Sequence, residues 1–221
     1  DPTNAVFGVP TNIAPDLERL DVMCDENESA CDLSIHSFVN IRELPTYGAL
    51  HVCEHEEIVT VGPRARNDGI TPPPGYATSP VDRGGGLTWH GPGQLVVYPI
   101  IKWNLEGESN VKAVIAILEE WVIAALSKLG VEGHRDERMQ GVWVGQNKIC
   151  SIGLSFLRWT SRHGLTINCN TPSGRVEMVS GCGLGQDTTT SLAALGYNIT
   201  TEMVIKSLTE NVSILSRSLA N

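Results

Sequence analysis

The sequence predicts an α+β fold, a single-domain mixed β-sheet sandwich with flanking helices. Short apolar segments bounded by turn residues predict strands between residues 49 and 101 and again between residues 141 and 169. A long segment with helical spacing of its apolar residues separates the two groups, and a second such segment ends the chain. The order strands, helix, strands, helix is typical of an α+β sandwich.

Composition limits the class of protein. A chain of 221 residues with 41% hydrophobic and 19% charged residues is long enough to bury the core of one domain. Its net charge of −9 argues against nucleic-acid binding, because proteins of that kind usually carry a basic surface. No apolar run approaches the roughly 18 residues of a membrane span, so we expect no membrane association. The six cysteines form no CxxC pair, which favours a reducing compartment over a disulfide framework.

The elements expected in the first half follow an irregular N-terminal arm, residues 1–35, with the main domain spanning 36–221. Strands are predicted at 49–53 and 58–61, separated by a polar turn. Residues 64–79 contain three successive prolines and two glycines, and their length suits a lid or a binding loop.

The second half contains the clearest helix, which is predicted to end at Gly130, a common residue after a helix C-terminus. Gly145 and Asn147 suit a hairpin turn. The remaining elements are a strand at 95–101, this helix at 111–129, strands at 141–144, 148–157 and 165–169, and a last amphipathic helix from about 201 to 219.

Residues 83–94, Arg-Gly-Gly-Gly-Leu-Thr-Trp-His-Gly-Pro-Gly-Gln, contain an unusual concentration of glycine. Glycine lets the backbone approach a ligand and adopt dihedral angles that a Cβ forbids. Arg83 and His90 add polar groups at that approach, and a buried strand follows directly. We interpret the segment as one wall of a substrate pocket.

Cys182 is the candidate nucleophile. It lies between two glycines in Ser-Gly-Cys-Gly-Leu-Gly, where the backbone can expose the sulfur and neighbouring N–H groups can stabilise a thiolate or an oxyanion. The alternative is a Gly-rich turn in which the cysteine has no role. The same glycines are a weak phosphate-binding signal, because the Lys-Ser/Thr of a P-loop is missing.

Lys148 could lower the pKa of that thiol if the fold brings the two together, because a nearby cation stabilises the thiolate. A solvated lysine at the end of a strand is the simpler interpretation of the pattern alone. Cys150 is expected on the same strand face and is a rival nucleophile, but no glycine flanks it. His163 could shape the pocket, shuttle protons or serve a structural role.

His51, Cys53 and His55 alternate, so a strand would present all three on one side. With Cys24 or Cys31 they could hold a metal ion. Zinc motifs normally place pairs of ligands on turns, and this spacing is unusual for them. We therefore expect no metal site, and interpret the residues as a strand face packed under the N-terminal arm.

Together these motifs resemble the lipoyl(octanoyl) transferases, in the biotin/lipoate protein ligase catalytic-domain superfamily. The resemblance covers residues 48–192. It rests on the segments Arg83–Gln94 with Tyr98-Pro99-Ile100, Gly141–Val144, Lys148–Gly153, His163–Asn168, Cys182-Gly183-Leu184 and Thr190-Ser191-Leu192.

The resemblance implies a biotin/lipoate protein ligase-like fold and an acyltransferase without a cofactor. Such an enzyme moves an octanoyl group from octanoyl-acyl carrier protein to a lysine of a lipoyl domain through a cysteine thioester, the first step of endogenous protein lipoylation. The acceptors implied are lipoyl domains of 2-oxoacid dehydrogenase complexes and the glycine cleavage H protein. Bacterial relatives are cytoplasmic and eukaryotic ones mitochondrial; residues 1–32 resemble no transit peptide, so we expect the cytoplasm.

The resemblance also implies roles for individual residues. Cys182 matches the nucleophile, and Lys148 matches the lysine that lowers its pKa. The substrate-binding residues fall in three segments: Arg83, Gly84, Gly85, Gly86, Leu87, Thr88, Trp89 and His90; Ser151, Ile152 and Gly153; and Gly164, Leu165 and Thr166.

The chain departs from the family pattern at Gly181, where proline is usual, and at Glu56, which follows His55 in place of proline. Two alternatives remain open. An ATP-dependent lipoate or biotin ligase would share the fold, use the lysine to bind an acyl-adenylate and need no cysteine. A degenerate homologue would bind the carrier protein without catalysis.

Overall fold

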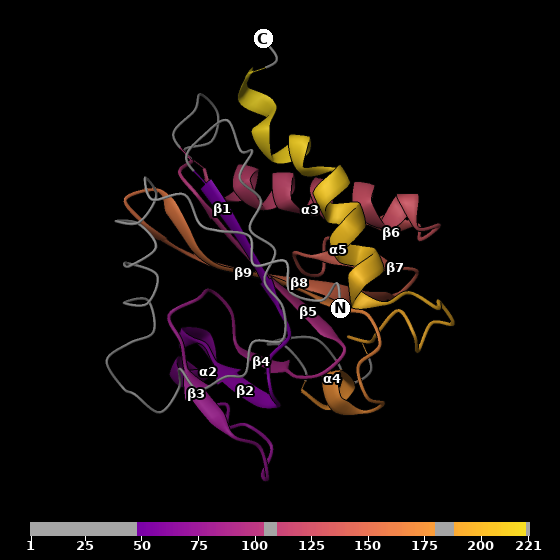
Figure 1. Cartoon of the computed structure of the whole chain (residues 1–221). Coiled ribbons are helices and arrows are strands. Elements are labelled where there is room, and N and C mark those ends of the chain that lie inside the picture. The colour runs from indigo at the N-terminus through magenta and orange to yellow at the C-terminus, as the bar shows by residue number, and fades with distance from the viewer. Residues whose placement is uncertain (1–47, 104–109, 180–187, 220–221) are drawn as a thin grey trace, which may run out of the picture. The chain divides into compact units, whose positions relative to one another are not determined.

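The computed structural model describes residues 48–103, 110–179 and 188–219, all within one compact unit. Their largest element is a six-stranded sheet, antiparallel throughout, with the order β1-β5-β9-β8-β7-β6 (Figure 1). Its strands are β1 (Gly48–Cys53), β5 (Gln94–Ile101), β9 (Thr160–Asn168), β8 (Asn147–Leu157), β7 (Val142–Val144) and β6 (Gly133–His134).

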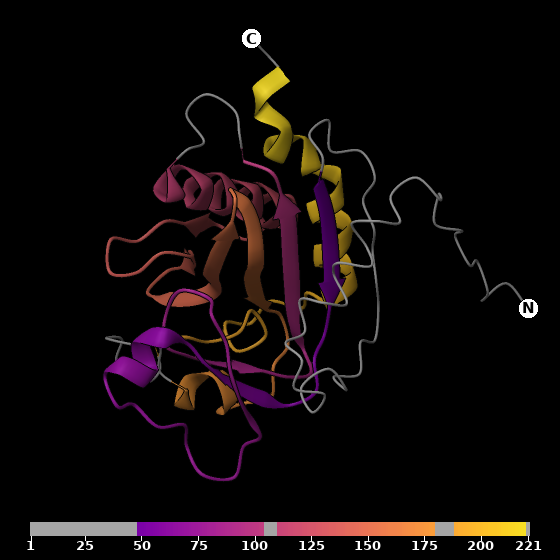
Figure 2. The ribbon, with the colours of Figure 1, turned by 90° about the vertical axis from the view of Figure 1, so that its left-hand side faces the viewer.

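A three-stranded sheet makes the fold mixed, as predicted. β2 (Ile58–Val61) pairs parallel with β3 (Thr78–Pro80) and antiparallel with β4 (Leu87–His90). Two short helices, α2 (Pro63–Asn67) and α4 (Arg175–Met178), lie in this part of the molecule, away from the long helices (Figures 1 and 2).

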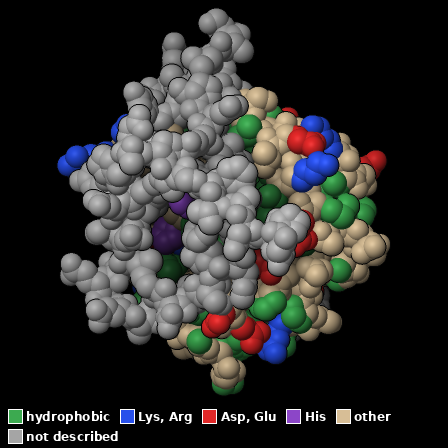
Figure 3. Space-filling model, viewed as in Figure 1, with side chains coloured by type: hydrophobic (Ala, Val, Ile, Leu, Met, Phe, Trp, Pro, Cys, Tyr) green, Lys and Arg blue, Asp and Glu red, His purple; other side chains and the backbone are tan. Residues whose placement is uncertain are grey.

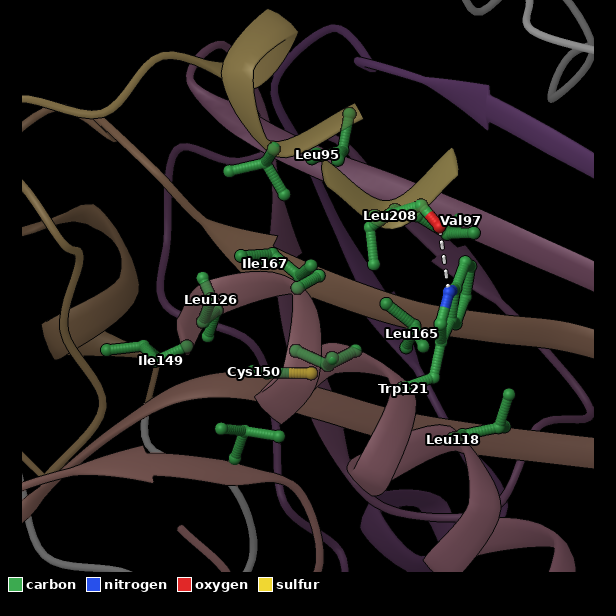
Figure 4. Close-up of a cluster of buried hydrophobic side chains, with 14 of the residues drawn as sticks. Leu95, Val97, Leu118, Trp121, Leu126, Ile149, Cys150, Leu165, Ile167 and Leu208 are labelled. Atoms are coloured by element: carbon green, nitrogen blue, oxygen red, sulfur yellow. Dashed lines mark hydrogen bonds between the residues drawn. The ribbon is translucent and has the colours of Figure 1, made fainter. Parts of the chain in front are cut away.

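The helices α3 (Val111–Lys128) and α5 (Thr201–Glu210), with the 3-10 helix η1 (Val212–Leu219), pack against one another beside the large sheet (Figure 2). The Asn110 side chain caps α3 by accepting from Lys112 N at 2.9 Å. Trp121 Nε1 donates to the Leu208 carbonyl at 3.0 Å, so the indole N–H buried between α3 and α5 has a partner (Figure 4).

The main core lies between these helices and the large sheet (Figure 4). Strand alternation sends every second side chain toward the helices. On β5 these are Leu95 and Val97, and on β9 they are Leu165 and Ile167, all of them buried. Each such burial contributes about 1.5–3 kcal/mol relative to exposure.

Two hairpin turns fix the register around β8. The predicted turn after β7 is confirmed, and Gly145 has the φ of 57° that such short turns require. The turn between β8 and β9 instead uses Arg158 and Trp159, with φ values of 50° and 63°. The Lys102 side chain and the Trp103 N–H bond to the carbonyls of these two residues and hold them in this uncommon conformation.

Some sequence expectations differ from the structure. Residues 64–79 are not a continuous loop, because Pro63 starts α2, whose Ala65 is buried. Leu87–His90 forms β4 within the predicted pocket wall. β9 begins at Thr160, so it includes His163. The last helix changes at Asn211 from α5 to the tighter η1.

The predicted arm, residues 1–35, lies outside the described residues, and its boundary with the main domain stays a prediction. None of the helices formed by the described residues combines the length and apolar character that a membrane crossing requires. On the face shown in Figure 3, acidic and basic side chains of the described residues are interspersed.

Candidate active site

Two of the three predicted substrate-binding segments are neighbours on β8 and β9. Ser151 pairs with Thr166, Ile152 with Leu165, and Gly153 with Gly164. Ile152 and Leu165 alternate into the core beneath the helices. The other four residues therefore belong to the opposite face of the sheet. The candidate site is built on this face.

The first segment meets the second through backbone contacts. Gly84 N donates to the Leu154 carbonyl at 3.0 Å. A Cβ added at Gly153 would lie 2.9 Å from Gly84 O and 3.0 Å from Arg83 Cδ, so glycine is needed for this approach. The buried Arg83 guanidinium donates to Thr60 Oγ1 at 2.8 Å and to Gly86 O at 3.0 Å. It thereby braces the Gly-rich segment against β2.

His90 anchors a buried polar network behind the same segment. Its Nε2 lies 3.1 Å from Thr60 Oγ1, and its Nδ1 lies 2.8 Å from Gln94 Oε1. Gln94 Nε2 donates to Asn168 Oδ1 at 2.9 Å, which continues the network onto the end of β9. Burial lowers the pKa of His90 to about 3, with help from the nearby His55 and Arg83. His90 is therefore neutral at physiological pH.

Lys148 is buried, with 4% of its surface exposed, although the pattern alone favours a solvated lysine. Burial lowers the pKa of its ammonium to about 8, while Cys150 and Glu119 act in the opposite direction. An amine with this pKa can be present in either protonation state close to neutral pH.

The residues after Cys182 return to Lys148. Lys148 N donates to the Thr188 carbonyl at 2.8 Å, and Thr190 N donates to the Lys148 carbonyl at 3.0 Å. These bonds form a short parallel bridge at the point where β9 no longer pairs with β8. Cys182 itself lies outside the described residues, so its role as the nucleophile stays a prediction.

Asn168 and Thr190 connect that bridge to the rest of the site. Asn168 Nδ2 donates to the Thr190 carbonyl at 3.0 Å, and Thr190 Oγ1 donates to Glu177 Oε1 at 2.9 Å. The hydrogen-bonded network from His90 through Gln94 therefore reaches the main chain beside Lys148. Hydrogen bonds and strand pairing therefore connect Lys148 with the described parts of all three substrate segments.

Cys150, the rival nucleophile, is fully buried in the main core (Figure 4). Burial raises the pKa of its thiol to about 12, so the thiolate is scarce at neutral pH. The expected sharing of a face with Lys148 is also interrupted. The register of β7 and β8 shifts by one residue at this point, and Ile149 and Cys150 both enter the core.

His163 adopts a left-handed φ of 59° inside β9. Its Nε2 contacts Asp82 Oδ1, and Arg162 Nη1 donates to Asp82 Oδ2 at 3.1 Å. Burial raises the pKa of Asp82, but the hydrogen bond and charge of His163, followed by the charge of Arg162, outweigh it and lower the pKa overall. These contacts tie the residue before Arg83 to β9, which favours the pocket-shaping interpretation of His163.

β1 ends at Cys53, so one strand does not present His51, Cys53 and His55 together, and His55 lies in the segment that follows it. His55 Nε2 lies 2.6 Å from Tyr98 Oη and 3.6 Å from Cys53 Sγ. Within the described ranges, no three His, Cys, Asp or Glu side chains are placed to hold a metal ion. Cys24 and Cys31 lie outside those ranges.

Sequence reasoning missed three residues that support the site. Asp82 carries no local motif, and Asn168 ends the motif His163–Asn168 but was given no role of its own. The partners of both residues are distant in sequence. Glu119 did carry a signal, because it stands four residues after Ile115 and three before Val122, on the apolar side of the predicted helix. A charged residue at such a position is buried and requires partners.

Comparison with known proteins gives consistent matches. Residues 31–213 match the family model of the lipoyl protein ligase A/B catalytic domain. Relatives named octanoyltransferase include one from Caldanaerobacter subterraneus subsp. tengcongensis, 34% identical over 81% of this chain and 81% of the relative. Others come from Escherichia coli, 32% identical over 83% and 85%, and from Magnetococcus marinus, 38% identical over 77% and 79%.

Solved structures with a similar fold include lipoate protein ligases. One is lipoate-protein ligase A bound with ATP, with a TM-score of 0.61, 13% identity and coverage of 78% of this chain and 74% of that chain. Another is a bipartite lipoate protein ligase from Thermoplasma acidophilum, with a TM-score of 0.58, 14% identity and coverage of 76% and 71%. At this identity the likeness establishes the fold alone.

Proposed function

The chain belongs to the lipoyl protein ligase A/B catalytic-domain family, and from this premise we propose that it is an octanoyltransferase acting in protein lipoylation. It transfers an octanoyl group from octanoyl-acyl carrier protein to a lysine of a lipoyl domain. One observation carries the assignment of the chemistry. The main-chain N–H and carbonyl of the buried Lys148 both form hydrogen bonds with the segment that follows Cys182.

In the first step, the Cys182 thiolate attacks the thioester carbonyl of the donor. A carbon–sulfur bond to Cys182 forms, the bond to the carrier thiol breaks, and the departing thiolate takes a proton from the Lys148 ammonium. The donor thioester is already activated, so the exchange needs no ATP. Before the attack, the ammonium favours the thiolate over the thiol.

In the second step, the amine of the acceptor lysine attacks the octanoyl-Cys182 thioester. An amide bond forms, the Cys182 thiolate leaves, and the proton lost by the amine passes to neutral Lys148. The cycle thereby restores both groups. A pKa of about 8 suits this role, because efficient proton transfer needs a group that titrates near the working pH.

The three segments 83–90, 151–153 and 164–166 bind the acyl donor in this proposal. Their glycines bring strand backbones close together, as at Gly153 and Gly84, and leave peptide groups rather than side chains at the site. We assign the acceptors to the lipoyl domains of 2-oxoacid dehydrogenase complexes and the glycine cleavage H protein. The compartment is the cytoplasm, or the mitochondrion in a eukaryote.

The test is a reaction without nucleotide that contains octanoyl-acyl carrier protein and an apo lipoyl domain. We expect octanoylation of the lipoyl domain, measured by intact mass. Omission of the acceptor should leave an octanoyl group on the enzyme, and peptide mapping should place it on Cys182. The Cys182→Ser variant should carry no octanoyl group and transfer none.

Three results would contradict the proposal. A requirement for ATP would indicate a ligase. Binding of the carrier protein without any transfer would indicate a degenerate homologue. An octanoyl group on Cys150 in the unmodified enzyme would overturn the choice of nucleophile.

A further inference from the structure

Glu119 is a carboxylate buried on the inner side of α3, with 6% of its surface exposed. Burying a charge is costly unless the charge is paired and hydrogen-bonded. Glu119 Oε2 accepts from Arg135 Nε at 3.0 Å. Its other oxygen, Oε1, accepts from the main-chain N–H of Gly141 at 2.8 Å. The carboxylate therefore connects α3 to the residue that precedes β7.

Gly141 lies directly against the Lys148 side chain. A Cβ added at Gly141 would lie 2.7 Å from Lys148 Cε and 2.1 Å from the Cys150 carbonyl oxygen. Its φ of 129° is a conformation that other residues rarely adopt. The Gly141 backbone thus bounds the space available to the last carbons of Lys148, and Glu119 holds that backbone in place.

We infer that Glu119 is a positioning residue for Lys148. Glu119 fixes the Gly141 backbone against the lysine side chain and provides a negative charge for the lysine ammonium. The inference rests on the proposed function, in which Lys148 gives and takes the proton. Glu119 acts through Gly141 and through its charge, without contact with the substrate.

The charged groups around Lys148 are few among the described residues. Glu119 approaches from α3, and Cys150, on β8 itself, is a neutral thiol at neutral pH. In the loop before β7, Asp136 and Arg138 form their own ion pair 2.7 Å apart. The bridging residues 188–190 are all threonine, and Thr190 contacts Glu177.

Arg135 determines how much of the Glu119 charge Lys148 experiences. Arg135 pairs with Glu119 at 3.0 Å and with Glu120 at 3.0 Å. Loss of the Glu119 charge lowers the pKa of Lys148, because an opposite charge near an ammonium favours its protonated form. Loss of the Arg135 charge raises that pKa, because the carboxylate is then less compensated. The two changes have opposite signs.

The experiment measures kcat/KM for octanoyl transfer across pH. The rate of the wild-type enzyme should fall at alkaline pH as Lys148 loses its proton. In Glu119→Gln this alkaline limb should move down by about one pH unit, as expected for a lost charge in a partly screened interior. In Arg135→Gln it should move up. Glu120→Gln is the matched control, because Glu120 also pairs with Arg135 whereas the Gly141 N–H donates to Glu119, and its limb should stay in place.

The outcomes separate the inference from the proposed function. A rate lowered by the same factor at every pH in Glu119→Gln would indicate a structural role and overturn the inference. If Glu119→Gln does not fold, the Arg135→Gln variant provides the test, because Arg135 is half-exposed. An unmoved alkaline limb in Arg135→Gln would also overturn the inference. Near-normal transfer by Lys148→Ala would overturn the proton-transfer role of Lys148 and the inference with it. Absence of transfer by the unmodified enzyme would overturn the proposed function itself, whatever the Glu119 variants do.

Discussion

The two faces of the large sheet make different demands on the same strands. On the helix-covered face, Leu95 and Ile167 pack by volume into an apolar core (Figure 4). On the opposite face, Gly153 and Gly164 bring backbones into contact. Neighbouring residues on β8 and β9 serve the two faces in turn, since Ile152 enters the core and Gly153 meets Gly84.

This difference shows how one strand pair carries both stability and chemistry. The helix-covered face depends on the amount of apolar surface that it buries, so its cost of substitution follows side-chain size. The opposite face depends on distances between main-chain atoms, where a single methyl group has nowhere to go. Substitutions of similar size should therefore have unequal effects on the two faces.

The largest effect is expected for Gly164→Ala. The added Cβ would lie 1.8 Å from the Val97 carbonyl oxygen, which β5 cannot move without breaking its pairing with β9. We expect the free energy of unfolding to fall by more than about 4 kcal/mol, among the largest losses for single substitutions. Urea denaturation followed by circular dichroism measures it.

Gly84→Ala is the control for the added methyl group. Its Cβ would meet Leu154 O at 3.4 Å, an ordinary contact, so we expect a loss below about 1 kcal/mol. If Gly164→Ala lowered the free energy of unfolding as little as Gly84→Ala does, the backbone contact at Gly164 would not restrict side chains on the site face.

A middle effect is expected on the helix-covered face for Leu95→Ala. Leu95 is fully buried, and truncation of such a leucine costs about 2–5 kcal/mol through lost burial and the cavity left behind. Because the site lies on the other face, the folded fraction should retain octanoyl transfer. Leu157→Ala, at a position 61% exposed, should change the free energy of unfolding by less than about 0.5 kcal/mol. A loss of transfer without a loss of stability in Leu95→Ala would contradict the separation of the faces.

Strong local patterns made much of the fold predictable. Apolar residues with helical spacing, followed by Gly130, predict α3, and a continuous apolar run predicts β5. The elements α2, β3, β6 and α4 are too short to show any period. The start of β9 was not predicted, because its polar residues give no strand pattern. Ser161 is buried there, and its Oγ accepts hydrogen bonds from Trp103 Nε1 and Ile101 N.

The candidate site was predictable as a set of motifs but not as an environment. The burial of Lys148 depends on the bridge at Thr188–Thr190, about forty residues further along the chain, and on Gly141. The different surroundings of Lys148 and Cys150 depend on a register shift that alternation does not foresee. Long-range pairing decides these features, whereas the sequence shows local spacing. The role of Cys182 remains a prediction.

An effect that depends on pH, and is absent at neutral pH, concerns the histidines behind the site face. Burial lowers the pKa of His90 to about 3, and it also lowers the pKa of His55, whose ring lies 5.8 Å away. Below pH of about 6.5 the unfolded chain binds protons that these buried rings exclude, so stability is complete above that pH and falls on acidification toward pH 3. His90 alone should contribute up to about 1.4 kcal/mol per pH unit within this window.

His90→Gln should make the free energy of unfolding less dependent on pH between 6 and 4, even if it lowers stability at pH 7 by disturbing the contacts with Thr60 and Gln94. Urea denaturation at several pH values separates the slope from the overall loss. His55→Gln should reduce the slope as well, because burial acts on that ring in the same direction. If both variants kept the wild-type slope, the acid sensitivity would lie in carboxylates, and the site face would owe its stability to its close backbone contacts rather than to neutral buried imidazoles.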